Sequence, residues 1–432
     1  MESTPGIKIH KFPISAATPY CAQWRDQRIY QHGWFFTRIG DAHETPGLEI
    51  FYIKGTAEHT AYAANGTMLW QWSDPQKRPS SVRVDSNVPL FDFDGDGRLE
   101  LVVFRHKDDE QEPRLCRLDA ATGETLAWSP ETVKLDPKWG DNRVSLVPMR
   151  LEGGQWGLAL HDDYAQISVF DAELNCLWTL PVEGLGHTTI PVDLDGDGVD
   201  ELYCGVLLLD AAGKVIWDRT NLLEGTGESH PDSNPVFTMQ GKTRLFFGPG
   251  GRILDAKGEI VWQLDGQQLK EIQSARVLTK RGADPALVFT DLPARRDLTW
   301  RGMKQRAVDS VNYFLNNELE VIGSVAGCHT PSIGDWNGDG NDELVLLDED
   351  LCHLLVINQK AETIARIPIQ ERVYVSDIRL APVLPDAKGE QIIIHEWSED
   401  WTKANFVIIE DTNAGDDRAE WNQLKSARWT TY

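Results

Sequence analysis

The chain has 432 residues and a formal net charge of −25. With 41% hydrophobic and 25% charged residues, its composition is that of an ordinary globular protein, which excludes a disordered chain. No Lys/Arg cluster stands out, and no apolar run approaches the roughly 18 residues of a membrane-spanning helix. We therefore expect a soluble protein that binds neither nucleic acid nor membrane.

The beginning of the chain shows neither the basic region nor the apolar region of a signal peptide. We expect a cytoplasmic protein, or a secreted one whose leader has been removed. The cysteines include no CxxC pair, which excludes zinc-ribbon and thioredoxin motifs. The first strand that we expect is IKIHKFPI, residues 7–14.

The rest of the chain repeats a plan of four short strands joined by Gly, Asn and Asp turns, the last strand often ending in Trp. The units begin near residues 33, 86, 143, 187, 230, 273, 329 and 376. No long amphipathic helix interrupts them, and this pattern is typical of an all-β fold, the β-propeller. We expect residues 1–432 to form one propeller domain with eight blades, or seven if a terminal unit only supplies a closing strand. Residues 7–14 could join the last blade and close the ring.

Three units carry nearly identical acidic loops, which read DFDGDGRLE, DLDGDGVDE and DWNGDGNDE. Oxygen ligands at alternate positions around a tight Gly-containing turn suit a hard cation such as Ca²⁺. An EF-hand would need a Glu at position twelve, whereas these loops close with Glu at position nine. The expected ligands are Asp92, Asp94, Asp96, Arg98 through its carbonyl and Glu100; Asp193, Asp195, Asp197, Val199 through its carbonyl and Glu201; and Asp335, Asn337, Asp339, Asn341 through its carbonyl and Glu343.

We therefore expect about three structural Ca²⁺ ions, each at the turn between the first and second strands of a blade. The alternative is a solvated Asp-Gly turn. Three divalent ions would also offset part of the negative charge.

The acidic loops resemble those of integrin-type FG-GAP propellers. The segment from Asp162 to Trp217, which contains Gly-His, DLDGDGVDE, LLLD and GKVIW, resembles the calcium-binding propeller polysaccharide lyases. Rhamnogalacturonan lyases of that group show this order of motifs, and similar propellers occur in ulvan lyases and in lyases that act on rhamnose-glucuronate ends. It implies β-elimination on a uronic-acid glycan. The chain departs from the family pattern at Glu271-Ile-Gln273, where His-Gly-Gln is usual.

The repeat also predicts a face for the chemistry. If the calcium turns lie at one face, then the starts of first strands and the turns between second and third strands lie at the opposite face, around the mouth of the central funnel. His187 and His329 lie at the same offset before an acidic loop. The residues expected at this mouth are Arg105, His106, His161, Tyr164, His187, His230, His329, His395 and Trp397.

A lyase needs a base, an acid and a group that neutralises the uronate carboxylate. We assign His187 or His161 as base, Tyr164 as acid, and Arg105 or His230 to the carboxylate. The remaining mouth residues, His106, His329, His395 and Trp397, are expected to bind substrate. The alternative for each His is a hydrogen-bonded pin between blades, and Tyr164 could belong to the core.

The leading interpretation is a lyase acting on an acidic poly- or oligosaccharide, in a monomeric protein. The alternative is a non-catalytic propeller that binds glycan or protein at the same face. A hydrolase with paired carboxylates is a third reading, but the acidic residues that we can place belong to the calcium loops. Most Trp residues end fourth strands, where packing between blades is the expected role.

Overall fold

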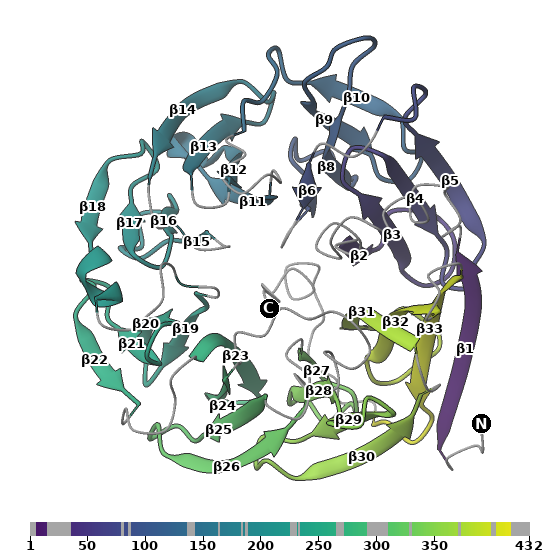
Figure 1. The fold of residues 1–432 in the computed structure, drawn as a ribbon, viewed down its shortest axis with the longest axis vertical. Coiled ribbons are helices and arrows are strands. Elements are labelled where there is room, and N and C mark those ends of the chain that lie inside the picture. The colour runs from purple at the N-terminus through teal and green to yellow at the C-terminus, as the bar shows by residue number, and fades with distance from the viewer. Residues whose placement is uncertain are drawn as a thin grey trace.

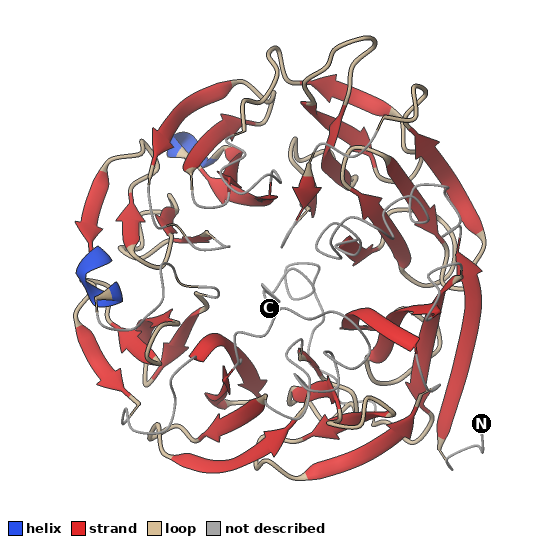
Figure 2. Ribbon diagram, in the orientation of Figure 1, coloured by secondary structure: helices blue, strands red, loops and turns tan. Residues whose placement is uncertain are grey.

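The computed structural model describes residues 6–14, 36–78, 82–84, 88–135, 143–162, 165–182, 185, 189–224, 231, 234–264, 272–291, 310–327, 331–369, 373–398 and 403–415. Strands dominate this part of the chain, and the helical pieces are the short 3₁₀ turns η3 (Glu152–Gly154) and η4 (Thr220–Leu223) (Figure 2). Neither turn has the length or the apolar character needed to cross a bilayer, and no other described segment forms such a helix.

Eight antiparallel sheets stand around a central axis, which confirms the predicted all-β, eight-bladed propeller (Figure 1). Blade 1 holds β2 (Phe36–Gly40), β3 (Glu49–Lys54), β4 (Glu58–Tyr62) and β5 (Met68–Ser73). Blade 2 holds β7 (Leu90–Phe91), β8 (Glu100–Arg105), β9 (Arg114–Asp119) and β10 (Thr125–Trp128). Blade 3 holds β11 (Arg143–Arg150), β12 (Trp156–Asp162), β13 (Gln166–Asp171) and β14 (Cys176–Pro181), and β6 (Arg83–Val84) pairs in parallel with β11. Blade 4 holds β15 (Ile190–Val192), β16 (Glu201–Tyr203), β17 (Leu207–Leu209) and β18 (Val215–Asp218).

The second half of the ring repeats this order from the innermost to the outermost strand. Blade 5 holds β19 (Val236–Met239), β20 (Lys242–Phe247), β21 (Arg252–Leu254) and β22 (Ile260–Gln263). Blade 6 holds β23 (Ile272–Lys280), β24 (Ala283–Asp291), β25 (Val311–Leu315) and β26 (Val321–Ala326). Blade 7 holds β27 (Ser332–Gly334), β28 (Glu343–Leu347), β29 (His353–Ile357) and β30 (Thr363–Pro368). Blade 8 holds β31 (Val373–Ala381), β32 (Gln391–Ser398), β33 (Ala404–Asp411) and, as its outermost strand, β1 (Ile7–Ile14).

Strand β1 joins the two ends of the chain. It pairs with β33 over its whole length, from Ile7 opposite Asp411 to Ile14 opposite Ala404. Figure 1 shows this N-terminal strand beside the C-terminal blade. A single apolar cluster then links β1, blade 8 and blade 1. Blade 8 therefore contains strands from both ends of the sequence, and this pairing closes the ring without an open sheet edge at the junction.

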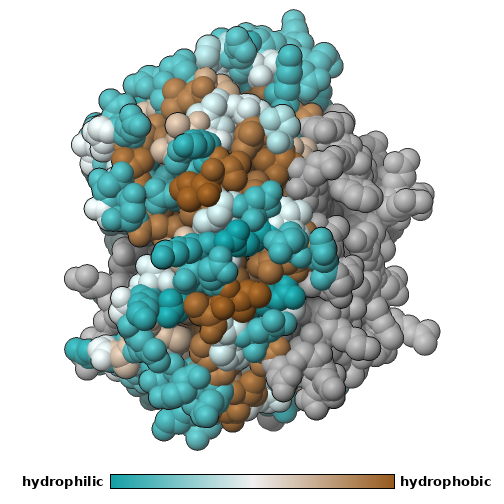
Figure 3. All heavy atoms as spheres, turned by 90° about the vertical axis from the view of Figure 1, so that its left-hand side faces the viewer, coloured by the Kyte–Doolittle hydropathy of each residue, from teal (hydrophilic) through white to brown (hydrophobic). Residues whose placement is uncertain are grey.

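The core lies between the blades. Middle strands such as β3, β8 and β28 are buried along their whole length, because each blade is covered on both faces by its neighbours. Outer strands instead leave apolar residues exposed on the rim, including Leu177, Val215, Ile216 and Ile260. Figure 3 shows apolar patches on the side of the molecule that forms the left-hand edge of Figure 1.

Tryptophans on outer strands connect neighbouring blades, which is the packing role that the sequence predicted, although the strands continue beyond the tryptophans. The indole N–H of Trp178 in blade 3 donates to the carbonyl of Ala211 in blade 4, at 2.8 Å. The ring of Trp178 also lies against Gly213, whose φ is +83° and where a Cβ would come within 2.9 Å of the indole. The same donation joins Trp70 to Ala120 and Trp217 to Ala256. These contacts form a latch between the outer strand of one blade and the turn of the next.

Candidate functional site

The three acidic loops lie where the sequence placed them, between the first and second strands of blades 2, 4 and 7. In each loop, the first Asp accepts backbone N–H bonds from residues further along the turn. Asp193, for example, accepts from Gly196 at 2.7 Å and from Gly198 at 3.0 Å. The Glu at position nine accepts the N–H of position two: Glu201 accepts from Leu194 at 2.8 Å. This frame holds several carboxylates around one turn.

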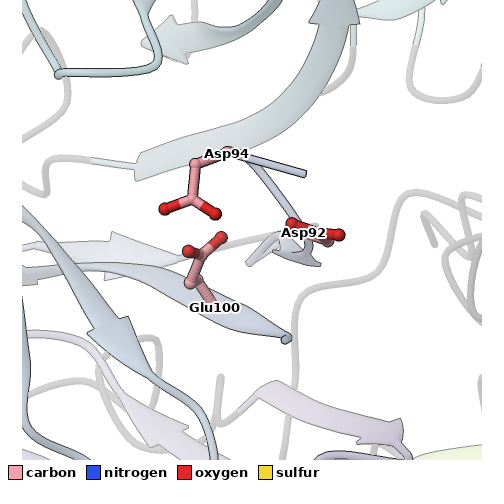
Figure 4. Close-up of side chains that lie close together, drawn as sticks. All are labelled: Asp92, Asp94 and Glu100. Atoms are coloured by element: carbon pink, nitrogen blue, oxygen red, sulfur yellow. The ribbon is translucent and has the colours of Figure 1, made fainter. Parts of the chain in front are cut away.

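Two of the loops form compact carboxylate clusters. One carboxylate oxygen from each of Asp92, Asp94 and Glu100 lies within 4.8 Å of the other two, and the same holds for Asp193, Asp195 and Asp197. Figure 4 shows the first group, with Asp94 and Glu100 facing one another. Each cluster could hold a metal ion because hard cations prefer several carboxylate oxygens at this spacing.

The other expected ligands take part in the hydrogen bonds of the same three turns. Asp96 accepts the N–H of Arg98 at 2.8 Å, and Val199 donates in the same way to Asp197 at 2.8 Å. In the third loop, the amide nitrogen of Asn337 donates to Asp339 at 3.2 Å and to Glu343 at 3.1 Å. That amide lies between two carboxylates. Asp335 and Asn341 complete the same turn, since Asp335 accepts from Gly340 and Asn341 donates to Asp339.

In all three loops, the surroundings of the Glu at position nine disfavour the ionised form of its carboxyl and raise its pKa. Burial, opposed in part by the N–H of Phe93, raises the pKa of Glu100 to about 7. Burial, together with Asp339 and Asp335, raises the pKa of Glu343 to about 9. Burial, together with Asp195 and Asp197, also raises the pKa of Glu201. A bound cation would counter both causes by attracting the ionised carboxylates.

Two further loops, residues 41–49 and 383–391, share the frame but lack Asp or Asn at positions three and five, and the sequence analysis missed them. In blade 1, Glu49 accepts the N–H of Ala42 at 2.8 Å and the hydroxyl of Thr45 at 2.7 Å. In blade 8, Gln391 accepts the N–H of Leu384 at 2.9 Å and donates to the carbonyl of Gly389 at 2.6 Å. In blade 1 the hydroxyl of Thr45 donates to the position-nine carboxylate, and in blade 8 an uncharged amide takes the place of that carboxylate. Neither arrangement needs a cation to balance a cluster of carboxylates. The nine-residue spacing before the second strand was the signal that could have revealed both loops.

The mouth residues on second strands occupy the predicted ends but are buried. Arg105 is the last residue of β8 and His106 follows it, His161 lies at the end of β12, and His395 lies near the end of β32. Their exposed fractions range from 1% for His161 and His395 to 6% for His106. The expectation that these four side chains line the mouth is therefore corrected: all four are buried.

Arg105 shows how this packing works. Its Nε donates to Nδ1 of the buried His59 at 3.2 Å, and its guanidinium lies 4.2 Å from the ring centroid of Trp72. Burial lowers the pKa of Arg105 to about 10, and burial together with Arg105 lowers the pKa of His59 to about 3. Both residues belong to the contact between blades 1 and 2.

His161 is also a pin between blades. Its Nδ1 shares a hydrogen bond of 2.6 Å with the hydroxyl of Thr189, which lies at the start of blade 4. His395 packs edge-on against Tyr52 of blade 1, and burial lowers its pKa to about 3. The pKa of His106 is lowered by burial and by Arg78. For His161, the alternative role of a hydrogen-bonded pin between blades is the one that its surroundings match.

The other mouth residues lie outside the described residues. These are Tyr164, His187, His230 and His329, together with the side chain of Trp397. Their roles stay predictions. Pro231 and Thr189, which adjoin two of these positions in the sequence, are both buried.

Comparison with known proteins shows which solved structures share this fold. No protein-family model matches the chain, and no curated protein sequence matches it. Among solved structures, the exotype rhamnogalacturonan lyase YesX is similar with a TM-score of 0.62 and 17% identity, over 96% of this chain and 77% of the other. Rhamnogalacturonan lyase YesW is similar with a TM-score of 0.56 and 18% identity, over 89% and 72%. The V. cholerae biofilm matrix protein Bap1 is similar with a TM-score of 0.57 and 11% identity, over 93% and 90%. The chain therefore shares its propeller fold with rhamnogalacturonan lyases and also with a matrix protein.

Proposed function

We propose that this protein is a lyase that cleaves an acidic, uronate-containing glycan by β-elimination. In this reaction a base removes the proton from C5 of the uronate, the C4–O bond breaks, and the electron pair forms the C4=C5 double bond. An acid returns a proton to the leaving oxygen. The observation that carries the proposal is the likeness to YesX over 96% of the chain, joined to the lyase-like motif that spans blade 4.

In the sequence, three of the proposed residues precede the first strands of blades 4, 5 and 7, and Tyr164 lies between β12 and β13 of blade 3. We assign His187 as the base, Tyr164 as the acid and His230 to the substrate carboxylate, with His329 as a further contact. The pin between His161 and Thr189 supports this choice because His161 precedes Tyr164 by three residues and Thr189 follows His187 by two. Since each residue spans at most about 3.6 Å, the pin restricts how far apart these two candidates can lie. His161 is then a positioning residue.

The decisive experiment is incubation with a panel of rhamnogalacturonan, ulvan and arabinogalactan, followed by the ultraviolet absorbance of the unsaturated uronate. We expect absorbance to rise with at least one polymer. His187→Ala should lower the rate by roughly 10²–10⁴-fold, the usual contribution of a general acid or base. Tyr164→Phe should act similarly.

His353→Ala is the matched control. His353 lies in blade 7, where its Nδ1 shares a hydrogen bond of 3.0 Å with Asp348. Its substitution by Ala should leave the rate of cleavage unchanged. A His187→Ala protein with normal turnover would remove this residue from the mechanism. Absence of unsaturated product with every polymer of the panel would contradict the lyase proposal.

We also propose that the acidic loops bind about three Ca²⁺ ions that stabilise the fold. Two clusters of three carboxylates support this, together with the shared frame of the third loop. Removing metal with a chelator should lower the melting temperature because a ligand that binds only the folded state stabilises it. Adding calcium back should restore the melting temperature. Asp193→Ala should reduce the difference in melting temperature between the calcium-loaded and the chelated protein.

Gln391→Ala is the control for this test, because the blade 8 loop satisfies its frame with an amide. It should lower the melting temperature equally with calcium and with chelator. An unchanged melt after verified metal removal would contradict a structural ion.

A non-catalytic propeller that binds glycan or protein is the second candidate. It is favoured by the burial of Arg105, His161 and His395, and by the fold likeness to the matrix protein Bap1. Binding of an acidic glycan without release of unsaturated product would select this candidate.

A further inference from the structure

A cavity of about 480 Å³ lies along the inner strands of blades 4 to 7. Strands β15, β19, β23 and β27 contribute to its wall, and Figure 1 shows them as the innermost strands of their blades. The wall is mainly apolar, with Ile190, Val192, Val236, Phe237 and Ile333 among its residues. We call this space the channel cavity.

One buried cation stands in this apolar wall. Arg276 is 3% exposed, and its Nε and Nη1 donate to the carbonyls of Pro331 at 3.2 Å and Ala275 at 3.0 Å. Among the described residues, Arg276 forms no ion pair, and its Nη2 makes no hydrogen bond. Burial and the nearby Arg379 lower the pKa of Arg276 to about 9. A buried charge of this kind is ordinarily paired with the opposite charge.

A second cation lies at one end of the cavity. Lys280 is four residues beyond Arg276 on β23, which is about 13 Å at the usual rise of a strand. It adjoins the hairpin turn beside the acidic loop of blade 7, where Thr279 bonds Asp342 at 2.7 Å. The channel cavity therefore combines apolar walls with positive charge inside a chain whose net charge is −25.

We propose that the channel cavity binds a small organic carboxylate with an apolar body. Its carboxylate would accept from Nη2 of Arg276, and its body would cover the aliphatic and aromatic wall. A bare sugar acid fits less well because its hydroxyl groups would face side chains that offer few hydrogen bonds. The cavity volume lies in the range of small-molecule sites. This inference does not rest on the lyase proposal.

Titration calorimetry with three probes tests the proposal: phenylacetate, its neutral analogue phenylacetamide, and the hydrophilic acid glucuronate. Phenylacetate should bind at least tenfold more tightly than either of the other two, because it alone offers both the charge and the apolar ring. A hydrogen bond to a charged group is commonly worth about one to two powers of ten in affinity.

Arg276→Gln should abolish the preference for phenylacetate over phenylacetamide. Arg366→Gln removes the same charge from an exposed position in blade 7 and should leave that preference intact. Because Arg276 also bridges blades 6 and 7, the first variant could lose stability. Thr238→Phe avoids this problem: Thr238 is an exposed residue of the cavity wall, and a ring there should block all binding without disturbing the core.

Equal affinity for phenylacetate and phenylacetamide would overturn the proposal, since the cation would then play no part. Equal or tighter binding of glucuronate would also overturn it and would assign the cavity to sugar acids.

Discussion

Buried cationic and imidazole side chains are concentrated where blades meet, and His59 is the best-defined example. Both of its ring nitrogens are used, since Nδ1 accepts from Arg105 and Nε2 lies 2.9 Å from the carbonyl of Gly55. Protonation of Nδ1 would place a proton against the N–H of Arg105 and a positive charge beside a guanidinium. His59 must therefore be neutral in the folded protein.

This neutrality predicts acid sensitivity. His59 has a folded pKa of about 3 against an ordinary value of 6.5, so between these values the unfolded chain takes up the proton and the folded chain does not. The His59 contribution to the free energy of unfolding is therefore complete above about pH 6.5 and declines as the pH falls toward 3. In urea unfolding at several pH values, the difference between wild type and His59→Gln should shrink as the pH falls. A pH-independent difference would contradict a neutral, buried imidazole.

The outer-strand latch is the element that repeats most clearly between blades. An indole crosses from one blade and donates to a turn of the next, and the glycine in that turn leaves room for the ring. Gly123, Gly213 and Gly258 have this role for Trp70, Trp178 and Trp217. Because these residues lie in different blades, the sequence repeat and the contact repeat have the same period.

Gly213→Ala should destabilise the protein for two reasons: its φ of +83° disfavours a side chain, and the new Cβ would collide with Trp178. Gly241→Ala is the matched control because its φ is +69° but nothing lies within 4 Å of the added Cβ. The control should cost about 1–2 kcal/mol of unfolding free energy, and Gly213→Ala should cost about 1 kcal/mol more. Equal costs, measured by denaturant unfolding, would show that the turn relaxes and that the latch is loose.

At the scale of the whole molecule, ring closure depends on β1. This strand covers the outer edge of β33 and contributes Ile14 to the apolar cluster that joins blades 8 and 1. Blades stabilise each other through their shared faces, so a fault at one junction weakens the ring as a unit.

Deletion of residues 1–14 should therefore lower the melting temperature and expose the edge of β33, which would increase aggregation. Deletion of residues 1–5 alone, which leaves β1 intact, should have little effect. The measurement is a thermal melt of both truncations, with light scattering to follow aggregation. A shortened protein that melts like the full chain would show that the blade 8 to blade 1 junction is held without the strand.

The sequence by itself determined the repeat and the position of the acidic loops, and it favoured eight blades while leaving seven open. These features depend on local order: turn residues at regular spacing, alternating apolar strands, and Asp at alternate positions of one loop. The ends of second strands were also placed correctly, since strand direction follows from the hairpins.

Only the tertiary structure decided which side chains are exposed at those ends. Arg105, His161 and His395 lie at the predicted ends but point into blade contacts, because a strand in a propeller is covered by neighbours that are distant in the sequence. The channel cavity and the buried Arg276 were invisible for the same reason, since four blades contribute to one wall. Loop chemistry can be predicted from a few adjacent residues, whereas burial is a property of the closed ring.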